Sequence, residues 1–355
     1  ADDCDIRRMF HEHTSGTTGT PLSLWVSRGV LRQWYALMEA RLRKWHGVSR
    51  KDRWGIFGGQ PVVPFAQRRP PFWVQNYGLN QIYFSVLHIA PWSAPYYLEA
   101  LKGFGLTHLI VYTNSLYALA CEVPPENMPV PSSLKVILTN AEPLFDFQRR
   151  RIEATFGCPA RETYGQAEMV CAASECEEGK LHWWPEVGVI EVLDEQDQAV
   201  PPGSMGRLVA TGLLNDDMPL VRYEVGDMVE QSDNVDAKCL CGRHLPVLGR
   251  VLGRNDDVIV TQDGRRIVQI DTIFAPGLHV REAQIVQEAL RQFTIRVVPS
   301  EGWSDRDAEY LRSALQEKIG EAEVRVRLVD RMEKTWAGKF RIIISNLPSE
   351  QRKEH

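Results

Sequence analysis

The chain has 355 residues, which exceeds the usual size of one domain core and favours one large and one small domain. Its 44% apolar and 25% charged residues are typical of a globular protein and exclude a disordered or membrane-embedded chain. A net charge of −5, with both signs interspersed, offers no basic stripe for nucleic acid and no polybasic patch for a membrane.

The first ten residues carry charges of both signs and no apolar core, so we expect no signal peptide. No later run approaches the roughly 18 apolar residues of a spanning helix, so we expect a cytoplasmic protein. Seven cysteines are an odd number for a disulfide framework and favour metal binding or burial. A homodimer is compatible with the sequence because symmetric dimers are the commonest assembly.

The first half of the chain alternates between helical spacing of apolar residues and short apolar runs. The predicted elements are a helix at 31–46, strands at 54–57 and 107–112 around a helix at 95–103, a strand at 134–139, a helix at 145–156 closed by Gly157, and a strand at 160–164. This alternation predicts an α/β fold with parallel sheet layers, in which ligands bind at the carboxyl ends of the strands.

Beyond Trp184 the pattern changes to strands and turns. The predicted elements are strands at 188–193, 207–212 and 220–230, a hairpin turning at Asp263-Gly264, strands at 284–290 and 293–298, a helix at 305–319 and a strand at 324–329. We expect a large domain over 1–253, with an antiparallel strand subdomain at about 186–253, and a small α+β domain over 254–355.

The loop at 14–21 packs four threonines, one serine and two glycines into eight positions. Such a loop can present hydroxyl and backbone N–H donors to phosphate oxygens, while the glycines permit close backbone approach. It is not a Walker loop, because the Gly-Lys-Ser/Thr ending is absent. Taken alone, the segment also fits a flexible Ser/Thr/Gly connector.

Six segments occur in the order found in adenylate-forming ligases, and the chain resembles that superfamily over essentially its whole length. They are the loop at 14–21, Asn-Ala-Glu-Pro-Leu at 140–144, Tyr-Gly-Gln-Ala-Glu at 164–168, Arg-Tyr-Glu-Val-Gly-Asp at 222–227, Gly-Arg-Asn-Asp-Asp at 253–257, and Gly338-Lys339. Ala-Glu-Pro-Leu, Gly-Cys-Pro at 157–159 and Cys-x-Cys-Gly-Arg at 239–243 look like the phenylacetate-CoA ligase branch, which includes CapK-type proteins of capsular polysaccharide clusters. The family normally has several dozen further residues before the phosphate loop, which we expect this chain to lack.

The resemblance implies nucleotide-binding roles for most of these residues. The phosphates of ATP would contact the loop residues Thr14, Ser15, Gly16, Thr17, Thr18, Gly19 and Thr20. The adenine would be flanked by Glu142, Pro143, Tyr164 and Gly165, with Ala141 and Gln166 in the same segments. The ribose would be bound by Asp227 and Arg254. Without the resemblance, Tyr164 also fits a buried core tyrosine and Asp227 a turn residue.

The remaining roles concern the reaction. Adenylation requires a carboxylate oxygen to attack the α-phosphorus of ATP in line while pyrophosphate leaves, so the enzyme must hold anions together. The resemblance implies that Glu168 binds Mg²⁺, that Lys339 touches both the substrate carboxylate and the α-phosphate, and that Asp256 is the hinge of a mobile C-terminal domain. Outside that context, Glu168 and Lys339 also fit solvated surface side chains.

Two residues depart from the family pattern. Thr20 stands where many relatives have Lys, and Ala167 replaces the Thr or Ser that usually precedes the motif glutamate. Each change removes one contact to a phosphate or carboxylate, worth about 1.5–3 kcal/mol. A loss of that size slows an enzyme without excluding catalysis.

The function that the resemblance implies is an AMP-forming ligase for a carboxylic acid, aryl or related, that transfers the acyl group to CoA. Two alternatives stay open: an acceptor that is an amine or hydroxyl of a saccharide or carrier, and a catalytically silent nucleotide-binding protein. Aromatic residues could line an aryl pocket or belong to the core. They are Trp54, Phe57, Tyr77, Tyr112 and Phe145.

A structural zinc site is predicted from spacing, with Cys176, His182, Cys239 and Cys241 as ligands. Cys239 and Cys241 are two residues apart, so in an extended segment both sulfurs would face the same way. Four such ligands in two short clusters match a closed tetrahedral Cys₃His site. Buried free cysteines are the competing interpretation.

Overall fold

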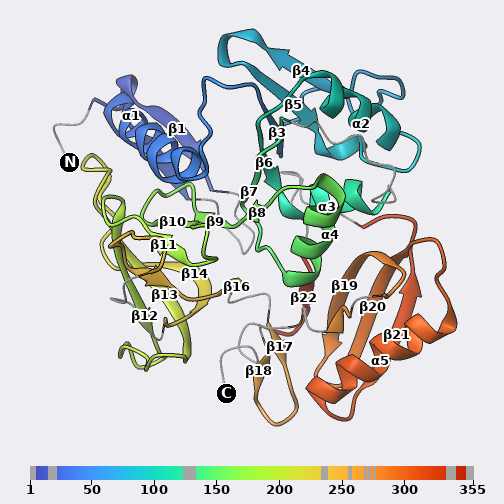
Figure 1. The fold of residues 1–355 in the computed structure, drawn as a ribbon. Coiled ribbons are helices and arrows are strands. Elements are labelled where there is room, and N and C mark those ends of the chain that lie inside the picture. The colour runs from blue at the N-terminus through green and yellow to red at the C-terminus, as the bar shows by residue number, and fades with distance from the viewer. Residues whose placement is uncertain are drawn as a thin grey trace.

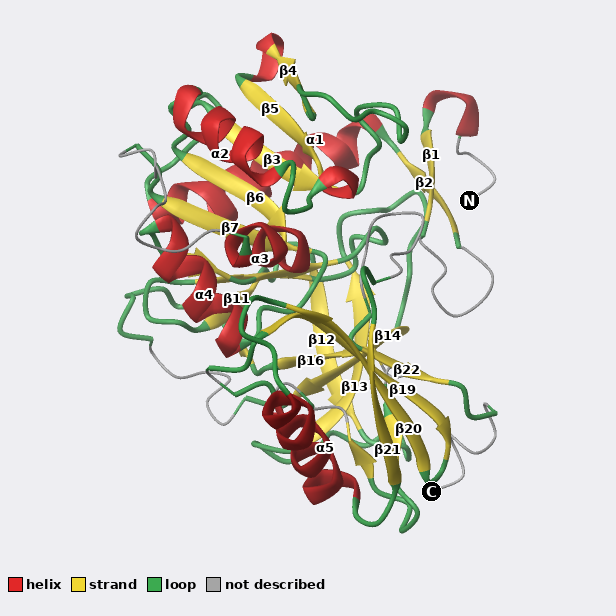
Figure 2. Ribbon diagram, turned by 90° about the vertical axis from the view of Figure 1, so that its right-hand side faces the viewer, coloured by secondary structure: helices red, strands yellow, loops and turns green. Residues whose placement is uncertain are grey.

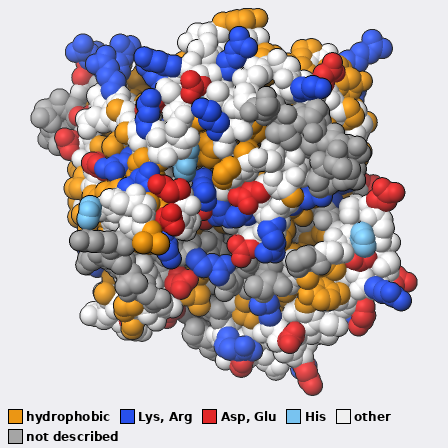
Figure 3. Space-filling model, in the orientation of Figure 1, with side chains coloured by type: hydrophobic (Ala, Val, Ile, Leu, Met, Phe, Trp, Pro, Cys, Tyr) orange, Lys and Arg blue, Asp and Glu red, His pale blue; other side chains and the backbone are white. Residues whose placement is uncertain are grey.

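The computed structural model describes residues 5–14, 22–122, 133–232, 239–254, 258–267, 270, 273–275, 277–332 and 341–348. No helix among these residues is both long and apolar enough to cross a membrane. Acidic and basic side chains lie side by side across the middle of the face shown in Figure 3, in keeping with the interspersed charges of the sequence.

A six-stranded sheet forms the centre of the N-terminal part, with strand order β4-β5-β3-β6-β7-β8 (Figure 1). Its strands are β3 (Trp54–Gly58), β4 (Trp73–Asn76), β5 (Gln81–Ser85), β6 (His108–Tyr112), β7 (Val136–Asn140) and β8 (Ala160–Arg161). All neighbouring pairs are parallel except β4 with β5. Strands β4 and β5 were not predicted from the sequence.

Helices cover both faces of this sheet. On one face, α2 (Ala94–Gly103), α3 (Thr113–Cys121) and α4 (Asp146–Phe156) contribute to a core that includes Phe57 and Phe84 of the strands. On the other face, α1 (Arg28–Leu37) continues as a π-helix over Met38–Arg43 and a 3-10 turn over Lys44–His46. The predicted helices at 31–46, 95–103 and 145–156 are therefore confirmed, and Gly157 closes α4 with a φ of 64°.

The prediction of one strand over 160–164 is wrong. The chain divides at Glu162 into β8, in the parallel sheet, and β9 (Thr163–Gly165), in a four-stranded antiparallel sheet. The reason is that the Glu162 amide donates 2.7 Å to a side-chain oxygen of Glu175 instead of to a strand ladder. Because β9 carries Tyr164, this division moves the tyrosine from the parallel sheet to a different layer.

Antiparallel strands form the middle of the chain. One sheet has the order β15-β11-β10-β9 and the other β12-β13-β14-β16, and a shared apolar core packs residues of both. The further strands are β10 (Ala172–Glu175), β11 (Leu181–Trp183), β12 (Gly188–Leu193), β13 (Met205–Gly212), β14 (Tyr223–Glu230), β15 (Val247–Leu248) and β16 (Val251–Arg254). A separate hairpin pairs β1 (Phe10–His13) with β2 (Ser23–Val26).

The C-terminal part is a smaller α+β unit, which lies below α3 and α4 in Figure 1. It contains the short pair β17 (Ile259–Val260) and β18 (Arg266–Ile267), and a sheet of β19 (Val280–Ala289), β20 (Gln292–Pro299), β21 (Glu323–Leu328) and β22 (Ile343–Ser345) in the order β21-β20-β19-β22. Helix α5 (Asp305–Ile319) lies along this sheet in Figure 2, and its Leu311 and Leu315 are fully buried there. The predicted helix at 305–319 is confirmed, whereas β22 was not predicted.

Candidate functional site

Several predicted site residues lie outside the described part of the chain. They are Ser15, Gly16, Thr17, Thr18, Gly19, Thr20, Asp256 and Lys339. The flanks of the phosphate loop are described: the Leu22 amide donates 2.9 Å to the Thr14 side chain, and the Thr14 amide donates 3.0 Å to the Leu22 carbonyl. Thr14 and Leu22, which flank the loop, are therefore paired by two hydrogen bonds.

Three predicted nucleotide residues from three strands converge on one another. The Tyr164 hydroxyl of β9 donates 2.6 Å to Oδ2 of Asp227 on β14, and an Arg254 guanidinium nitrogen on β16 lies 3.4 Å from Oδ1. Asp227 and Arg254 are direct partners in the β14–β16 register. Gly226 adopts a φ of 83°, and an added Cβ would lie only 3.0 Å from the Arg254 guanidinium. The glycine therefore permits the arginine to lie against the backbone beside the carboxylate.

Burial controls the electrostatics of this cluster. It raises the pKa of the Asp227 carboxyl, while Arg254 and the hydrogen bond from Tyr164 act in the opposite direction. Burial together with the nearby carboxylate also raises the pKa of Tyr164 well above its ordinary value. A protonated phenol and an arginine thus hold one carboxylate in a fixed orientation, and its remaining lone pairs can accept hydrogen bonds from a ligand's hydroxyls.

Glu168 has a partner that the sequence analysis missed. The Tyr223 hydroxyl donates 2.9 Å to Oε1 of Glu168, and burial plus that carboxylate raise the pKa of Tyr223 to about 12. No described residue bonds to the other oxygen, Oε2. Tyr223 lies in the predicted ribose segment at 222–227, so the sequence assigns it to the same site. Its hydrogen bond to Glu168 could not be predicted, because it depends on β14 lying beside the turn that follows β9.

Glu142 lies where the adenine segment was predicted, but its side chain is turned inward. It is buried, and its Oε2 accepts a 2.8 Å hydrogen bond from the Asn114 amide at the start of α3. Its backbone carbonyl accepts a 3.2 Å bond from the Thr113 hydroxyl. The side chain of Glu142 therefore fixes the loop to α3, which leaves the backbone of 141–143 as the part that can face a ligand.

The backbone is strained at three of these segments. Ala141, Met169 and Arg222 adopt positive φ values of 64°, 52° and 47°, in the left-handed region that non-glycine residues rarely occupy. They lie in, or directly after, the segments that contain Glu142, Glu168 and Asp227. Such strain clusters at functional sites because the surrounding structure fixes it there.

Gln166 shows an incomplete hydrogen-bond set. Its amide nitrogen donates 2.8 Å to the Cys171 sulfur, whereas its buried Oε1 has no partner among the described residues.

The aromatic residues predicted to line an aryl pocket lie in different surroundings. Trp54 and Phe57 are core residues, Tyr77 is 80% exposed, and Phe145 stacks on Phe147. Tyr112, at the end of β6, is the register partner of Asn140 in the predicted adenine segment.

The four predicted zinc ligands lie together. Their candidate ligand atoms are within 4.8 Å of one another. The sulfurs of Cys176 and Cys239 are 3.8 Å apart, and the Cys241 sulfur is 3.5 Å from Nε2 of His182. In a tetrahedron with Zn–S bonds of about 2.3 Å and Zn–N bonds of about 2.0–2.1 Å, these separations would be roughly 3.8 Å and 3.6 Å. The cluster therefore fits a zinc ion.

The surroundings of the cluster agree with a metal site. Nδ1 of His182 lies 3.0 Å from the Leu245 carbonyl, which orients the ring and leaves Nε2 free to bind a metal. The expectation of an extended Cys-x-Cys segment is wrong. Residues 239–242 form a turn in which the Gly242 amide donates 3.0 Å to the Cys239 carbonyl, and Leu240 projects into solvent at its tip.

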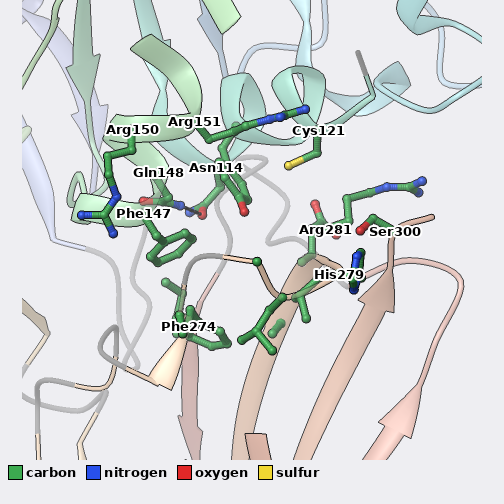
Figure 4. A pocket seen from close by; sticks show the side chains of 18 residues that line it. Asn114, Cys121, Phe147, Gln148, Arg150, Arg151, Phe274, His279, Arg281 and Ser300 are labelled. Carbon is green, nitrogen blue, oxygen red and sulfur yellow. Dashed lines mark hydrogen bonds between the residues drawn. The ribbon is translucent and has the colours of Figure 1, made fainter. Parts of the chain in front are cut away.

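A cavity of about 510 Å³ lies between α3 and α4 on one side and the C-terminal unit on the other (Figure 4). Phe147 and Phe274 approach each other across it, with ring centroids 5.5 Å apart. Its arginines are largely engaged: Arg281 pairs with Glu122 at 2.9 Å, and Arg151 donates to the Ala120 carbonyl. The cavity thus marks the contact between the two parts of the chain.

The chain is similar in sequence to several known proteins. Residues 259–346 match the family model of the CapK C-terminal domain. The chain is 26% identical to protein CapK of Staphylococcus aureus over 353 residues, covering 96% of this chain and 75% of CapK. It is 25% identical to the phenylacetate-coenzyme A ligase of Pseudomonas putida over 296 residues, 78% of this chain and 58% of the ligase.

The fold is that of a solved ligase. A crystal structure of 2-hydroxyisobutyryl-CoA ligase in the postadenylation state, in complex with an acyl-AMP, aligns with a TM-score of 0.70 at 21% identity, over 97% of this chain and 75% of that one. The same enzyme in the thioesterification state aligns with a TM-score of 0.55. In sequence the chain is similar to CapK and to the phenylacetate-CoA ligases, and its fold is that of the adenylate-forming ligases.

Proposed function

We propose that this chain activates a carboxylic acid with ATP, forming an acyl-adenylate and pyrophosphate, and then transfers the acyl group to CoA. In the first step the carboxylate oxygen bonds to the α-phosphorus and the bond to pyrophosphate breaks. In the second step the thiol attacks the acyl carbonyl and AMP leaves. The observation that carries the proposal is the convergence of Tyr164, Asp227 and Arg254 beside Glu168 and its partner Tyr223.

In this proposal, Asp227 accepts hydrogen bonds from the ribose hydroxyls. Tyr164 and Arg254 keep its carboxylate oriented, because each donates to a different oxygen. The backbone at 141–143 and the Tyr164 ring flank the adenine, and the loop at 14–20 binds the phosphates. Lys339, on the C-terminal domain, neutralises the anions that meet at the α-phosphorus.

Glu168 would hold Mg²⁺ in this proposal. The fit rests on the carboxylate itself: Tyr223 orients one oxygen and no described residue occupies the other. Magnesium prefers one or two carboxylates together with phosphate oxygens and water. When bound, the ion supplies charge neutralisation to the phosphates.

The zinc would be structural. Three sulfurs and one nitrogen complete a tetrahedron, so no coordination position is open for a substrate. Cys176 and His182 lie at either end of the β10–β11 turn, and the Cys239 turn precedes β15. The metal would therefore fasten the segment that follows Glu168 to the segment that leads from β14 to β16.

The chain is proposed to divide into a large domain over 1–253 and a small one over 254–355, with the hinge at Asp256. Rotation about the hinge would withdraw Lys339 after adenylation and open the site to the acceptor. The acceptor itself could instead be an amine or hydroxyl, which would use the same first step.

The test is pyrophosphate release with ATP, Mg²⁺ and a panel of carboxylic acids, followed by addition of CoA or of an amine such as hydroxylamine. The proposal predicts acid-dependent release and then a thioester when CoA is present. A hydroxamate but no thioester would support the alternative acceptor. Tight ATP binding without release for any acid would contradict the enzyme and support a silent nucleotide-binding protein.

A further inference from the structure

Two tyrosines present their hydroxyls toward the carboxyl edge of the parallel sheet, from the strands that flank β3. Tyr83 is the middle residue of β5, and its hydroxyl reaches Gln60 beyond β3, whereas Tyr112 ends β6. Both side chains are partly exposed, and both approach the short loop that follows β3 at Gly58. Ligand sites of parallel sheets form at this edge, and the proposed function has not used either residue.

Each phenol oxygen accepts a hydrogen bond from the backbone of this loop. The Gln60 amide donates 3.3 Å to the Tyr83 hydroxyl, and the Gly59 backbone donates to that of Tyr112. Neither hydroxyl donates its own proton to a described residue. Burial raises the pKa of both tyrosines, so both remain protonated donors near neutral pH. Two fixed O–H donors are thus left for a ligand or water.

Glycine at position 58 is required for this arrangement. A Cβ added there would clash with the Tyr83 hydroxyl, so any larger residue would displace the phenol from the loop. Gly58 is at the same level as Ser85 of β5 in the parallel register, one residue beyond the pair Phe57 and Phe84. The close approach of the phenol is therefore built into the strand ends.

The tyrosine pair lies next to the predicted nucleotide segment at 140–144. Tyr112 is the register partner of Asn140, the first residue of the 140–144 segment. The Glu142 carboxylate is near enough to raise the pKa of Tyr112. Since the strand order is β5-β3-β6-β7, an acid whose carboxylate reacts beside the nucleotide would extend from β7 across β6 and β3 toward β5. Its distal part would meet Tyr112 first and Tyr83 next.

We propose that Tyr83 and Tyr112 form a subsite that recognises an oxygen on the distal part of the acid. This inference rests on the proposed function. It identifies the substrate class as acids that carry a hydroxyl, carbonyl or second carboxylate, in place of unsubstituted aryl or alkyl acids. A site that donates hydrogen bonds to a substrate oxygen discriminates against an analogue that lacks the oxygen, because its donors are then left unpaired.

The experiment compares three pairs of acids by ATP–pyrophosphate exchange: 4-hydroxyphenylacetate with phenylacetate, 4-hydroxybenzoate with benzoate, and succinate with butyrate. We expect kcat/KM to favour the oxygenated member of at least one pair by about tenfold or more. Tyr83→Phe and Tyr112→Phe should each reduce that preference by about tenfold and change kcat/KM for the plain member by less than about threefold. Tyr310→Phe, at an exposed tyrosine of α5, should leave both values unchanged.

The selectivity ratio separates recognition from folding. A purely structural role would lower kcat/KM for both members alike, and that result would overturn the inference, as would wild-type protein that prefers the plain acid in all three pairs. Both results would leave the proposed function intact, since exchange would still occur. Absence of exchange with all six acids would contradict the proposed function itself, and the inference with it.

Discussion

His108 is a fully buried histidine at the start of β6, remote from the proposed chemistry. Arg43 donates to its Nε2 at 3.3 Å, and Thr107 lies 2.9 Å from its Nδ1. The His108 ring stacks on Trp54, and the Arg43 guanidinium carbon lies 4.9 Å from the centroid of the Trp54 ring. Burial, and then the arginine charge, lower the pKa of His108 to about 4. The imidazole is therefore neutral in the folded protein and accepts the arginine's hydrogen bond.

This lowered pKa predicts a pH-dependent stability. Below pH 6.5 the unfolded chain binds a proton that the folded chain does not, so stability is present above that value and is lost as the pH falls toward 4. Between pH 7 and pH 5 the loss from His108 should be about 2 kcal/mol. Urea unfolding at the two pH values should show a smaller loss in His108→Gln than in the parent. His11→Gln, at an exposed histidine, should behave as the parent does.

An equal loss of stability in His108→Gln and the parent would contradict this assignment.

Individual residues of the candidate site differ in how far the sequence could predict them. The resemblance implied an adenine role for Tyr164 and ribose roles for Asp227 and Arg254; these roles stay predictions, and the structure shows the three side chains in contact. The bond from Tyr223 to Glu168 was not predicted, because it depends on how β14 sits against the loop after β9.

At the scale of elements, periodicity predicted most helices and strands, but it missed β4, β5 and β22 and joined β8 and β9 into one strand. The helix at 305–319 has a clear apolar stripe and a capping box at Ser304, so its limits were predictable. The division of 160–164 at Glu162 was not, since it depends on the carboxylate of Glu175. The Cys239 turn likewise depends on Gly242, whose φ is 75°.

The zinc cluster gives a prediction at this scale. Protein purified without a His-tag should contain about one zinc per chain, and Cys239→Ser should lose most of it because a ligand is removed. A destabilisation of about 3 kcal/mol would lower Tm by roughly 6–12 °C. Cys121→Ser is the control, since Cys121 lies on α3 outside the cluster and its loss should leave the zinc content unchanged. Zinc-free parent protein, or unchanged zinc in Cys239→Ser, would reject the site.

For the whole molecule, the contact between the two parts has its own structure (Figure 4). Phe147 of α4 packs against the C-terminal core, close to Phe274, and its ring meets Tyr117 edge-on. Arg281 of β19 pairs with Glu122, just beyond α3. The sequence alone could not predict this contact, because the apolar and charged residues of α3, α4 and β19 could equally well pair with other surfaces.

Phe147 joins the two parts of the chain in the arrangement that the structure shows. If the Phe147 contact stabilises this arrangement, Phe147→Ala should slow pyrophosphate exchange by about tenfold, while transfer of a supplied acyl-adenylate to CoA changes by less than about threefold. Phe65→Ala, at an exposed phenylalanine, should affect neither step. Equal slowing of both steps would show that the contact does not favour one arrangement.

The central claim is that the chain forms an acyl-adenylate. The most direct measurement is mass spectrometry of the small molecules bound after incubation with ATP, Mg²⁺ and the acid that gives the fastest exchange, without CoA. The proposal predicts a species with the mass of the acid plus AMP minus water from wild-type protein. Lys339→Ala should bind ATP yet yield none of that species, because the lysine acts mainly in the transition state. ATP bound without any acyl-adenylate in the wild-type protein, or the same yield from Lys339→Ala, would contradict the account.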